Sequence, residues 1–372
     1  MPSEHPIRSV RRLCSTALLA LTLVLTGCET SRFIGQAVHG QLDMWRRETP
    51  IKTLLQRTNT PPEIARRLEL VLAYRKFAHE ELGLPAGRSY LAYADLERPF
   101  VSWTVSATPE FSMKDQEWWF PIVGSVSYRG YFEEASARRY ASNLVARGLD
   151  VSIGGVSAYS TLGWFADPVL NTFLFYPEDE LADLIFHELT HRLLYVSGDT
   201  DFNEAFATFV AHEGLRRWFL RHPDPGAEAK WKLKQVRWEE FRAEIFASRS
   251  RLKLVYEGSG ASDVAALRTA KAAEIARLRT QLTELHGKWA GEPDIRGWLH
   301  HPINNARLNS VATYYLWVPS FGSLLSDCSD DLPAFYREVG RLGKLSKSDR
   351  QVRMEALLGR AKAASGGPKN SS

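Results

Sequence analysis

The segment FHELTHRLLYVSGDTDFNEAFATF, residues 186–209, decides the fold because it predicts two polar helices that follow each other closely. Pro177 and three consecutive acids precede it, where the positive end of a helix dipole favours negative charge. The first helix therefore carries the HELTH residues. The pattern DFNEAFATFVAHEG predicts the second helix, after the ten-residue connection RLLYVSGDTD.

The first of these helices has the spacing of a metal site. His187 and His191 are four residues apart, so both imidazoles project from one helix face and can bind one ion, with Glu188 beside them. In such a site the metal polarises a carbonyl and acidifies a bound water, and the glutamate moves the water's proton to the leaving amine. We expect zinc as the cofactor and Glu188 as general base. The alternative is a polar helix face with surface histidines.

The second helix offers the third protein ligand that a catalytic zinc site needs. Glu204 and Glu213 are the candidates, and they are nine residues apart. That spacing is a rotation of about 900° along a helix, so the two carboxylates point to opposite faces and only one can face the metal. Glu204 lies near the helix start among small residues that allow close approach, and we expect it to be the ligand.

HELTH followed by NEAFA resembles the gluzincin metallopeptidases, whose thermolysin-like members carry HExxH and a later NExxS. Residue by residue, the resemblance implies a zincin-like catalytic domain in which His187, His191 and Glu204 bind zinc and Glu188 is the general base. Two features differ from that family. Twelve residues separate His191 from Glu204 instead of a longer connection, and Thr208 stands where the family has an aspartate that orients a ligand histidine.

A longer stretch, from AYSTLGWFADP through the two helices to VAHEG, resembles the bacterial family of predicted zinc aminopeptidases. The resemblance includes GYF at 130–132 and NNARLNSVATYYLWVPSF at 304–321. It implies an aminopeptidase with a peptide substrate. Two alternatives remain open: an endopeptidase or amidase that acts on cell-wall peptides, and a non-catalytic lipid-anchored scaffold. Structural zinc sites usually have four ligands and are rich in cysteine, which argues against the scaffold.

Peptide hydrolysis also needs a donor for the oxyanion, and two tyrosines late in the chain are our candidates. Tyr314 and Tyr315 lie on a predicted helix whose first turn holds Asn305, which we expect to contact substrate. Core or surface aromatics are the alternative for both tyrosines. Tyr159 is a rival donor, and the extended edge at Gly155, just upstream, could bind substrate backbone by strand addition.

An aminopeptidase must also hold the free amino group of its substrate, usually with a carboxylate. Asp167, Glu133 and Glu134 are possible candidates, although each is equally suited to a turn or to the start of a helix. The sequence does not choose among them.

The N-terminus predicts export and lipid attachment. Arginines precede an apolar run of about fifteen residues, shorter than the roughly twenty that a membrane-spanning helix needs, so residues 1–27 are expected to be a signal peptide. Leu25-Thr26-Gly27-Cys28 resembles the bacterial lipobox, which implies a lipid on Cys28 and a membrane as partner. Glu29 favours the outer membrane, facing the periplasm, over the inner membrane. Only Cys328 then remains, so no intramolecular disulfide is expected in the mature chain.

The composition is that of a soluble globular protein, with 44% hydrophobic and 24% charged residues. The net charge of +4 is spread along the chain without a basic block, which argues against nucleic acid as a partner. Strand and helix patterns upstream of the histidines predict an α+β fold, mostly helical with a small mixed β-sheet.

Between residues 226 and 290 two long charged helices are separated by a Gly-Ser-Gly turn, and apolar residues of the second step by three and four. This spacing makes a narrow seam and predicts an inserted antiparallel hairpin that packs on itself or on the body. The expected organisation is 1–27 signal peptide, 28–60 lipidated connecting segment, 61–225 catalytic core, 226–290 hairpin, 291–361 C-terminal helical part completing the site, and 362–372 disordered tail.

Overall fold

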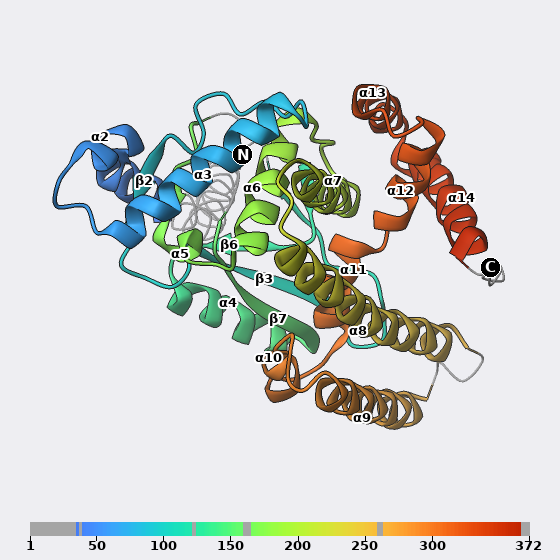
Figure 1. Ribbon diagram of the computed structural model, residues 1–372. Helices are drawn as coiled ribbons and strands as arrows, with labels where there is room; N and C mark the ends of the chain where they lie inside the picture. Colours follow the sequence, from blue (N-terminus) through green and yellow to red (C-terminus); the bar gives the residue numbers. More distant parts are fainter. Residues whose placement is uncertain (1–34, 37–38, 121–123, 159–164, 259–262, 366–372) are drawn as a thin grey trace, which may run out of the picture.

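The structure is a computed structural model that describes residues 35–36, 39–120, 124–158, 165–258 and 263–365 (Figure 1). The predicted signal segment, Cys28 and Tyr159 lie outside the described residues. Among the helices that are described, none combines the length and the hydropathy that crossing a bilayer requires.

Helices make up most of the described chain, in agreement with an α+β protein dominated by helices. The helices are α2 (Ile51–Gln56), α3 (Pro62–Glu80), α4 (Glu134–Ala146), α5 (Asn171–Leu174), α6 (Glu178–Leu193), α7 (Thr200–Arg221), α8 (Pro225–Glu257), α9 (Val264–Lys288), α10 (Arg296–His300), α11 (Asn305–Tyr315), α12 (Val318–Asp327), α13 (Leu332–Gly343) and α14 (Lys347–Ser365). The strands are β1 (Thr49–Pro50), β2 (Ala92–Ala94), β3 (Ser102–Pro109), β4 (Trp118–Phe120), β5 (Gly124–Val126), β6 (Arg129–Tyr131), β7 (Leu149–Val156) and β8 (Val169–Leu170).

The centre of the molecule is the pair α6 and α7, which lie side by side in Figure 1. Helix α6 starts directly after Pro177 with three acids in its first turn, as its sequence predicts. Asp199 caps α7 by accepting a hydrogen bond from the backbone N–H of Phe202 at 3.3 Å. Phe186 and Phe206, both within 1% of full burial, belong to the core around this pair.

Gly214 allows α7 to pack tightly at this core. A Cβ atom added at Gly214 would lie 2.7 Å from both Leu82 Cδ1 and Phe186 Cδ2, closer than real side chains approach. Both neighbours are at least 99% buried, so neither can move aside into solvent. The sequence thus needs glycine inside this helix despite its low helix propensity.

Replacing Gly214 with alanine is therefore expected to lower the free energy of unfolding by about 1–3 kcal/mol, the usual cost of overpacking a core. Gly287→Ala is the matched control, because Gly287 is also helical and its added Cβ meets nothing within 4 Å. That control should keep or raise stability by up to about 1 kcal/mol. Urea denaturation of the two variants measures the difference, and equal stabilities would contradict the close packing at Gly214.

The described strands form three separate small sheets, and not only the one small mixed sheet expected from the sequence. One has the order β6-β3-β7 and is antiparallel throughout. A second joins β1, β2 and β8, with β2 and β8 parallel, and the third is the pair β4-β5. The strands of the second sheet are only two or three residues long, too short for an alternating pattern to reveal them.

Strand β3 has two chemically different faces. Trp103, Val105 and Ala107 belong to the apolar cluster that β3 forms with α4. The alternate residues point to the opposite face, where α11 packs across β3 and β7. The sheet is therefore covered by a helix on each side, and its polar face is the one directed at the centre of the molecule.

The predicted hairpin corresponds to α8 and α9, which extend from the body at the lower right of Figure 1. Leu278 and Leu282 of α9 are fully buried against a cluster that includes Phe241 and Ile245 of α8. The same cluster contains Leu308 of α11. The hairpin thus packs on itself and also on the helix that lies over β3.

Both ends of the described chain show more regular structure than the sequence suggested. The segment 28–60 contains β1 and α2, and Ile51 is 1% exposed within the main core. At the other end α14 continues to Ser365, four residues into the tail expected from residue 362.

Candidate metal centre

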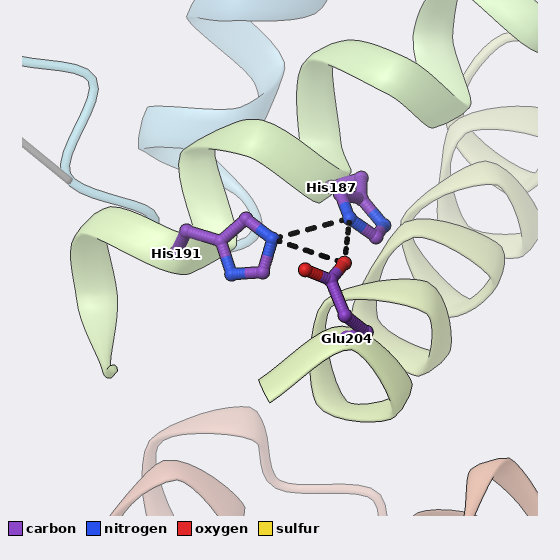
Figure 2. A group of neighbouring side chains, drawn as sticks. All are labelled: His187, His191 and Glu204. Atoms are coloured by element: carbon purple, nitrogen blue, oxygen red, sulfur yellow. Dashed lines mark hydrogen bonds and ion pairs between the residues drawn. The ribbon is translucent and has the colours of Figure 1, made fainter. Parts of the chain in front are cut away.

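Three potential ligand atoms meet between α6 and α7 (Figure 2). Nε2 of His187 lies 3.2 Å from Glu204 Oε2 and 3.2 Å from Nε2 of His191. The third separation, from His191 Nε2 to Glu204 Oε2, is 3.5 Å. The two histidines expected to share a helix face and the glutamate expected to oppose them are thus brought together.

These separations suit a single tetrahedral ion. Zinc binds nitrogen at about 2.0–2.1 Å and carboxylate oxygen at about 2.0–2.2 Å, so neighbouring ligand atoms around it are about 3.3–3.4 Å apart. The three distances of 3.2, 3.2 and 3.5 Å bracket that value. Three protein ligands leave one tetrahedral corner for water or substrate, the arrangement of catalytic rather than structural zinc sites.

Glu204 is prepared to act as an anionic ligand. Burial alone would raise the pKa of its carboxyl group, but the charge of His191 and hydrogen bonds from both histidines outweigh burial and lower that pKa. The carboxylate is therefore ionised at neutral pH, as metal binding requires. No partner among the described residues accepts or donates a hydrogen bond at the buried Nδ1 of His191, so the carboxylate that often orients a ligand histidine is not seen there.

Asn203, the neighbour of Glu204, fixes the connection between the two helices. Its side-chain oxygen accepts a hydrogen bond from the Val196 N–H at 2.8 Å, and its side-chain nitrogen donates one to the Val196 carbonyl at 2.8 Å. Asn203 is 1% exposed, so both bonds form away from water. These two hydrogen bonds hold the short connection between α6 and α7 against the first turn of α7, next to Glu204.

The ligand atoms open onto a cavity of about 430 Å³. Glu188 lines it together with the three ligands, and burial raises the pKa of Glu188 while the neighbouring imidazoles lower it. The polar face of β3 contributes Ser102, Thr104 and Ser106 to the wall. Apolar parts of the wall come from Phe120, Val126, Phe132, Val156, Ala158 and Ala306.

Two tyrosines bring hydroxyl groups to this cavity. Tyr314 of α11 lines it, with its ring centroid 6.1 Å from that of His187. Tyr128, between β5 and β6, also lines it, and no motif in the sequence singled this residue out. The charge of Glu204 and burial raise the pKa of Tyr314, and burial raises the pKa of Tyr128, so both phenols stay protonated and can donate hydrogen bonds.

Three predicted site residues do not line the cavity. Tyr315 turns about 100° away from Tyr314 on the same helix, and the guanidinium of Arg242 lies 4.5 Å from its ring. Asn305 is fully buried and accepts a hydrogen bond from the Tyr256 hydroxyl at 3.0 Å, a structural role. Gly155 lies on β7 at the sheet edge, facing the ring of Phe100.

The rejected ligand candidate and the acids proposed for amine binding all have other contacts. Glu213 accepts hydrogen bonds from Arg216 and Arg217 at 2.7 and 2.6 Å and, as expected, is not among the three side chains that converge. Glu133 accepts a hydrogen bond from Ser136, Glu134 pairs with Arg138, and Asp167 lies 3.5 Å from the Ser89 hydroxyl. None of these acids is among the described residues that line the cavity.

A different acid, Asp115, does line the cavity. It lies in the loop after β3 and accepts a hydrogen bond from Asn309 Nδ2 of α11 at 2.8 Å. No sequence motif singles out Asp115, because its position depends on how that loop packs against a helix nearly two hundred residues later.

Comparison with known protein families gives a match over most of the chain. A family model described as "Putative aminopeptidase" matches residues 32–354, a range that contains every described residue of the metal centre and of the cavity. No curated protein and no solved structure matches the chain.

Proposed function

We propose a function from one premise, that the chain belongs to the "Putative aminopeptidase" family. The proposal is a zinc-dependent metallopeptidase that hydrolyses peptides near their amino terminus. One observation carries it: two histidines and a glutamate meet at tetrahedral separations in the wall of a cavity that also contains Glu188. Family membership supports peptide hydrolysis, and the ligand geometry supports zinc.

Glu188 is the proposed general base. When bound, zinc supplies a Lewis acid that lowers the pKa of water and polarises a carbonyl. Glu188 would accept the proton of the attacking water and deliver it to the amine that leaves. Its buried position suits both steps, because burial raises its pKa above that of an exposed glutamate and makes it a better proton acceptor.

Tyr314 and Tyr128 are the proposed donors for the oxyanion that forms when water attacks the carbonyl. Both phenols line the cavity, and both remain protonated at neutral pH. A donor that already points into a cavity of low dielectric stabilises developing negative charge with little reorganisation. Tyr315, directed away from the cavity, has no such role in this proposal.

We also propose that the protein is held at the outer membrane, facing the periplasm, by a lipid on Cys28. The support is the sequence Leu25-Thr26-Gly27-Cys28 after an apolar run. Labelling cells with palmitate, in the wild type and in Cys28→Ser, tests the anchor. Equal label in both proteins would rule out attachment at this cysteine.

Removal of metal should abolish the activity. Purified protein is expected to hold about one zinc per chain and to hydrolyse aminoacyl peptides, because three protein ligands bind the ion. Treatment with a chelator should remove the zinc and abolish hydrolysis, and added zinc should restore the zinc content and the hydrolysis. Atomic absorption and a peptide assay on the same samples measure this. Full hydrolysis by protein shown to be free of metal would contradict the proposal.

A further inference from the structure

Asp115 is a carboxylate in the cavity that the proposed chemistry does not use. Of the three acids among the described lining residues, Glu204 is a metal ligand and Glu188 is the general base, which leaves Asp115. Two hydrogen bonds hold Asp115 in position. Asn309 Nδ2 donates to one of its carboxylate oxygens at 2.8 Å, and in the loop backbone the Gln116 N–H donates to the Ala107 carbonyl at 2.8 Å.

The carboxylate of Asp115 has only partial compensation for its burial. Burial raises its pKa to about 6, and the hydrogen bond from Asn309 acts in the opposite direction. Arg249 attracts it only from a distance, because the Arg249 Nε donates to Asn309 Oδ1 at 2.9 Å instead. Within the described ranges no lysine or arginine lies within 4.0 Å of Asp115. A cationic ligand would therefore gain an ion pair that the protein does not itself provide.

Helix α11 gives a measure of the distance between Asp115 and the metal centre. Asn309, which holds Asp115, and Tyr314, which lies beside His187, are five residues apart on this helix. The separation is about 7.5 Å along the axis, at about 1.5 Å per residue. Two residues of an extended peptide, at roughly 3.3 Å each, cover most of that axial length, and one residue covers less than half of it.

We propose that Asp115 binds the α-ammonium group of the peptide substrate, so that the enzyme requires a free amino terminus and cleaves a segment of about two residues from it. The inference rests on the proposed function, and it assigns a specificity residue that is distinct from Asp167, Glu133 and Glu134. An ammonium bound by a partly buried carboxylate makes charge-assisted hydrogen bonds, which are stronger than neutral ones. The apolar wall around Phe120 and Phe132 suits an apolar first side chain.

Asp115→Asn is the test variant, because asparagine keeps an oxygen that can accept the Asn309 hydrogen bond and removes only the charge. Asp201→Asn is the matched control. Asp201 lies near the same Arg249 and borders a neighbouring cavity of about 240 Å³, which Asp115 also lines, but Asp201 does not line the cavity of the metal centre. Both variants are compared with wild type by circular dichroism before use.

Two measurements keep this inference separate from the proposed function. The first is calorimetric binding of leucinamide and of N-acetylleucinamide to the protein with its metal removed, so that no hydrolysis is needed. The second is kcat/KM for a leucyl peptide and its N-acetylated form with zinc present. We expect wild type and Asp201→Asn to prefer the free amine, and Asp115→Asn to lose affinity and kcat/KM for it by about 10- to 100-fold.

The outcomes are distinct. Loss of free-amine binding in Asp115→Asn alone supports the inference, even if wild type hydrolyses neither peptide and the proposed function fails. Equal binding and equal kcat/KM for the free-amine ligands in wild type and Asp115→Asn overturn the inference, while hydrolysis by both leaves the proposed function standing. Equal losses in Asp115→Asn and Asp201→Asn would also overturn it, because the effect would then belong to the shared network around Arg249.

Discussion

Replacing Glu188 with glutamine is expected to lower kcat/KM for peptide hydrolysis by about 10²- to 10⁴-fold, the range typical of general acid–base catalysis. Glutamine has the size of glutamate but cannot accept a proton from water at neutral pH. Zinc content should stay at the wild-type value, because Glu188 is not one of the three residues whose ligand atoms converge. Atomic absorption and steady-state kinetics on one preparation separate the two quantities.

The loss of activity must be a loss of proton transfer and not of substrate binding. Binding of leucinamide to metal-free Glu188→Gln, where no hydrolysis takes place, should therefore remain within a few-fold of its binding to metal-free wild type. Hydrolysis at the wild-type rate by Glu188→Gln with zinc bound would eliminate Glu188 as general base, and the carboxylate in the cavity would need another role.

The second large effect is on the metal itself. Glu204→Gln should weaken zinc binding by more than about 100-fold, since changes to residues that merely support the ligands already cost about 10- to 100-fold. Glutamine lacks the negative charge of the Glu204 carboxylate, whose Oε2 lies 3.2 Å from His187 Nε2 and 3.5 Å from His191 Nε2. Titration with a competing chelator of known affinity measures the change, and hydrolysis should fall in proportion to the zinc lost.

Glu213→Gln is the control for this experiment, because it makes the same substitution on the same helix. Glu213 is also buried, but its partners are Arg216 and Arg217 on the face away from the metal. The Glu213→Gln variant should bind zinc with the wild-type affinity, even where the broken ion pairs cause a small loss of stability. Equal zinc loss in both variants would mean that Glu204 acts through the fold of α7 and not as a ligand.

Local patterns were sufficient to predict which three side chains converge between α6 and α7. Histidines four residues apart share a helix face in any α-helix, and two glutamates nine residues apart do not. The prediction of His187, His191 and Glu204 as neighbours, with Glu213 excluded, depended only on that periodicity and on a short connection. The hairpin α8–α9 was predictable for the same reason, since a three-four spacing of apolar residues is itself a local signal.

Features that depend on distant contacts could not be predicted in this way. Asp115 is placed by a helix that follows it by nearly two hundred residues, and Tyr128 by a turn between two three-residue strands. Whether Tyr314 or Tyr315 faces the cavity depends on how α11 is rotated about its axis. The packing of α11 on β3 and α8 sets that rotation. Asn305 had the right chemistry for substrate binding but is used to anchor a loop.

The double hydrogen bond between Asn203 and Val196 has a consequence for how the centre acquires its ion. A loop that had to become ordered around a metal would consume part of the binding free energy as lost conformational entropy. Here the buried side chain of Asn203 already holds the connection in place one residue before Glu204. The three side chains are preorganised, so a zinc ion bound by them as proposed would keep most of the affinity of the three donor atoms against competing chelators.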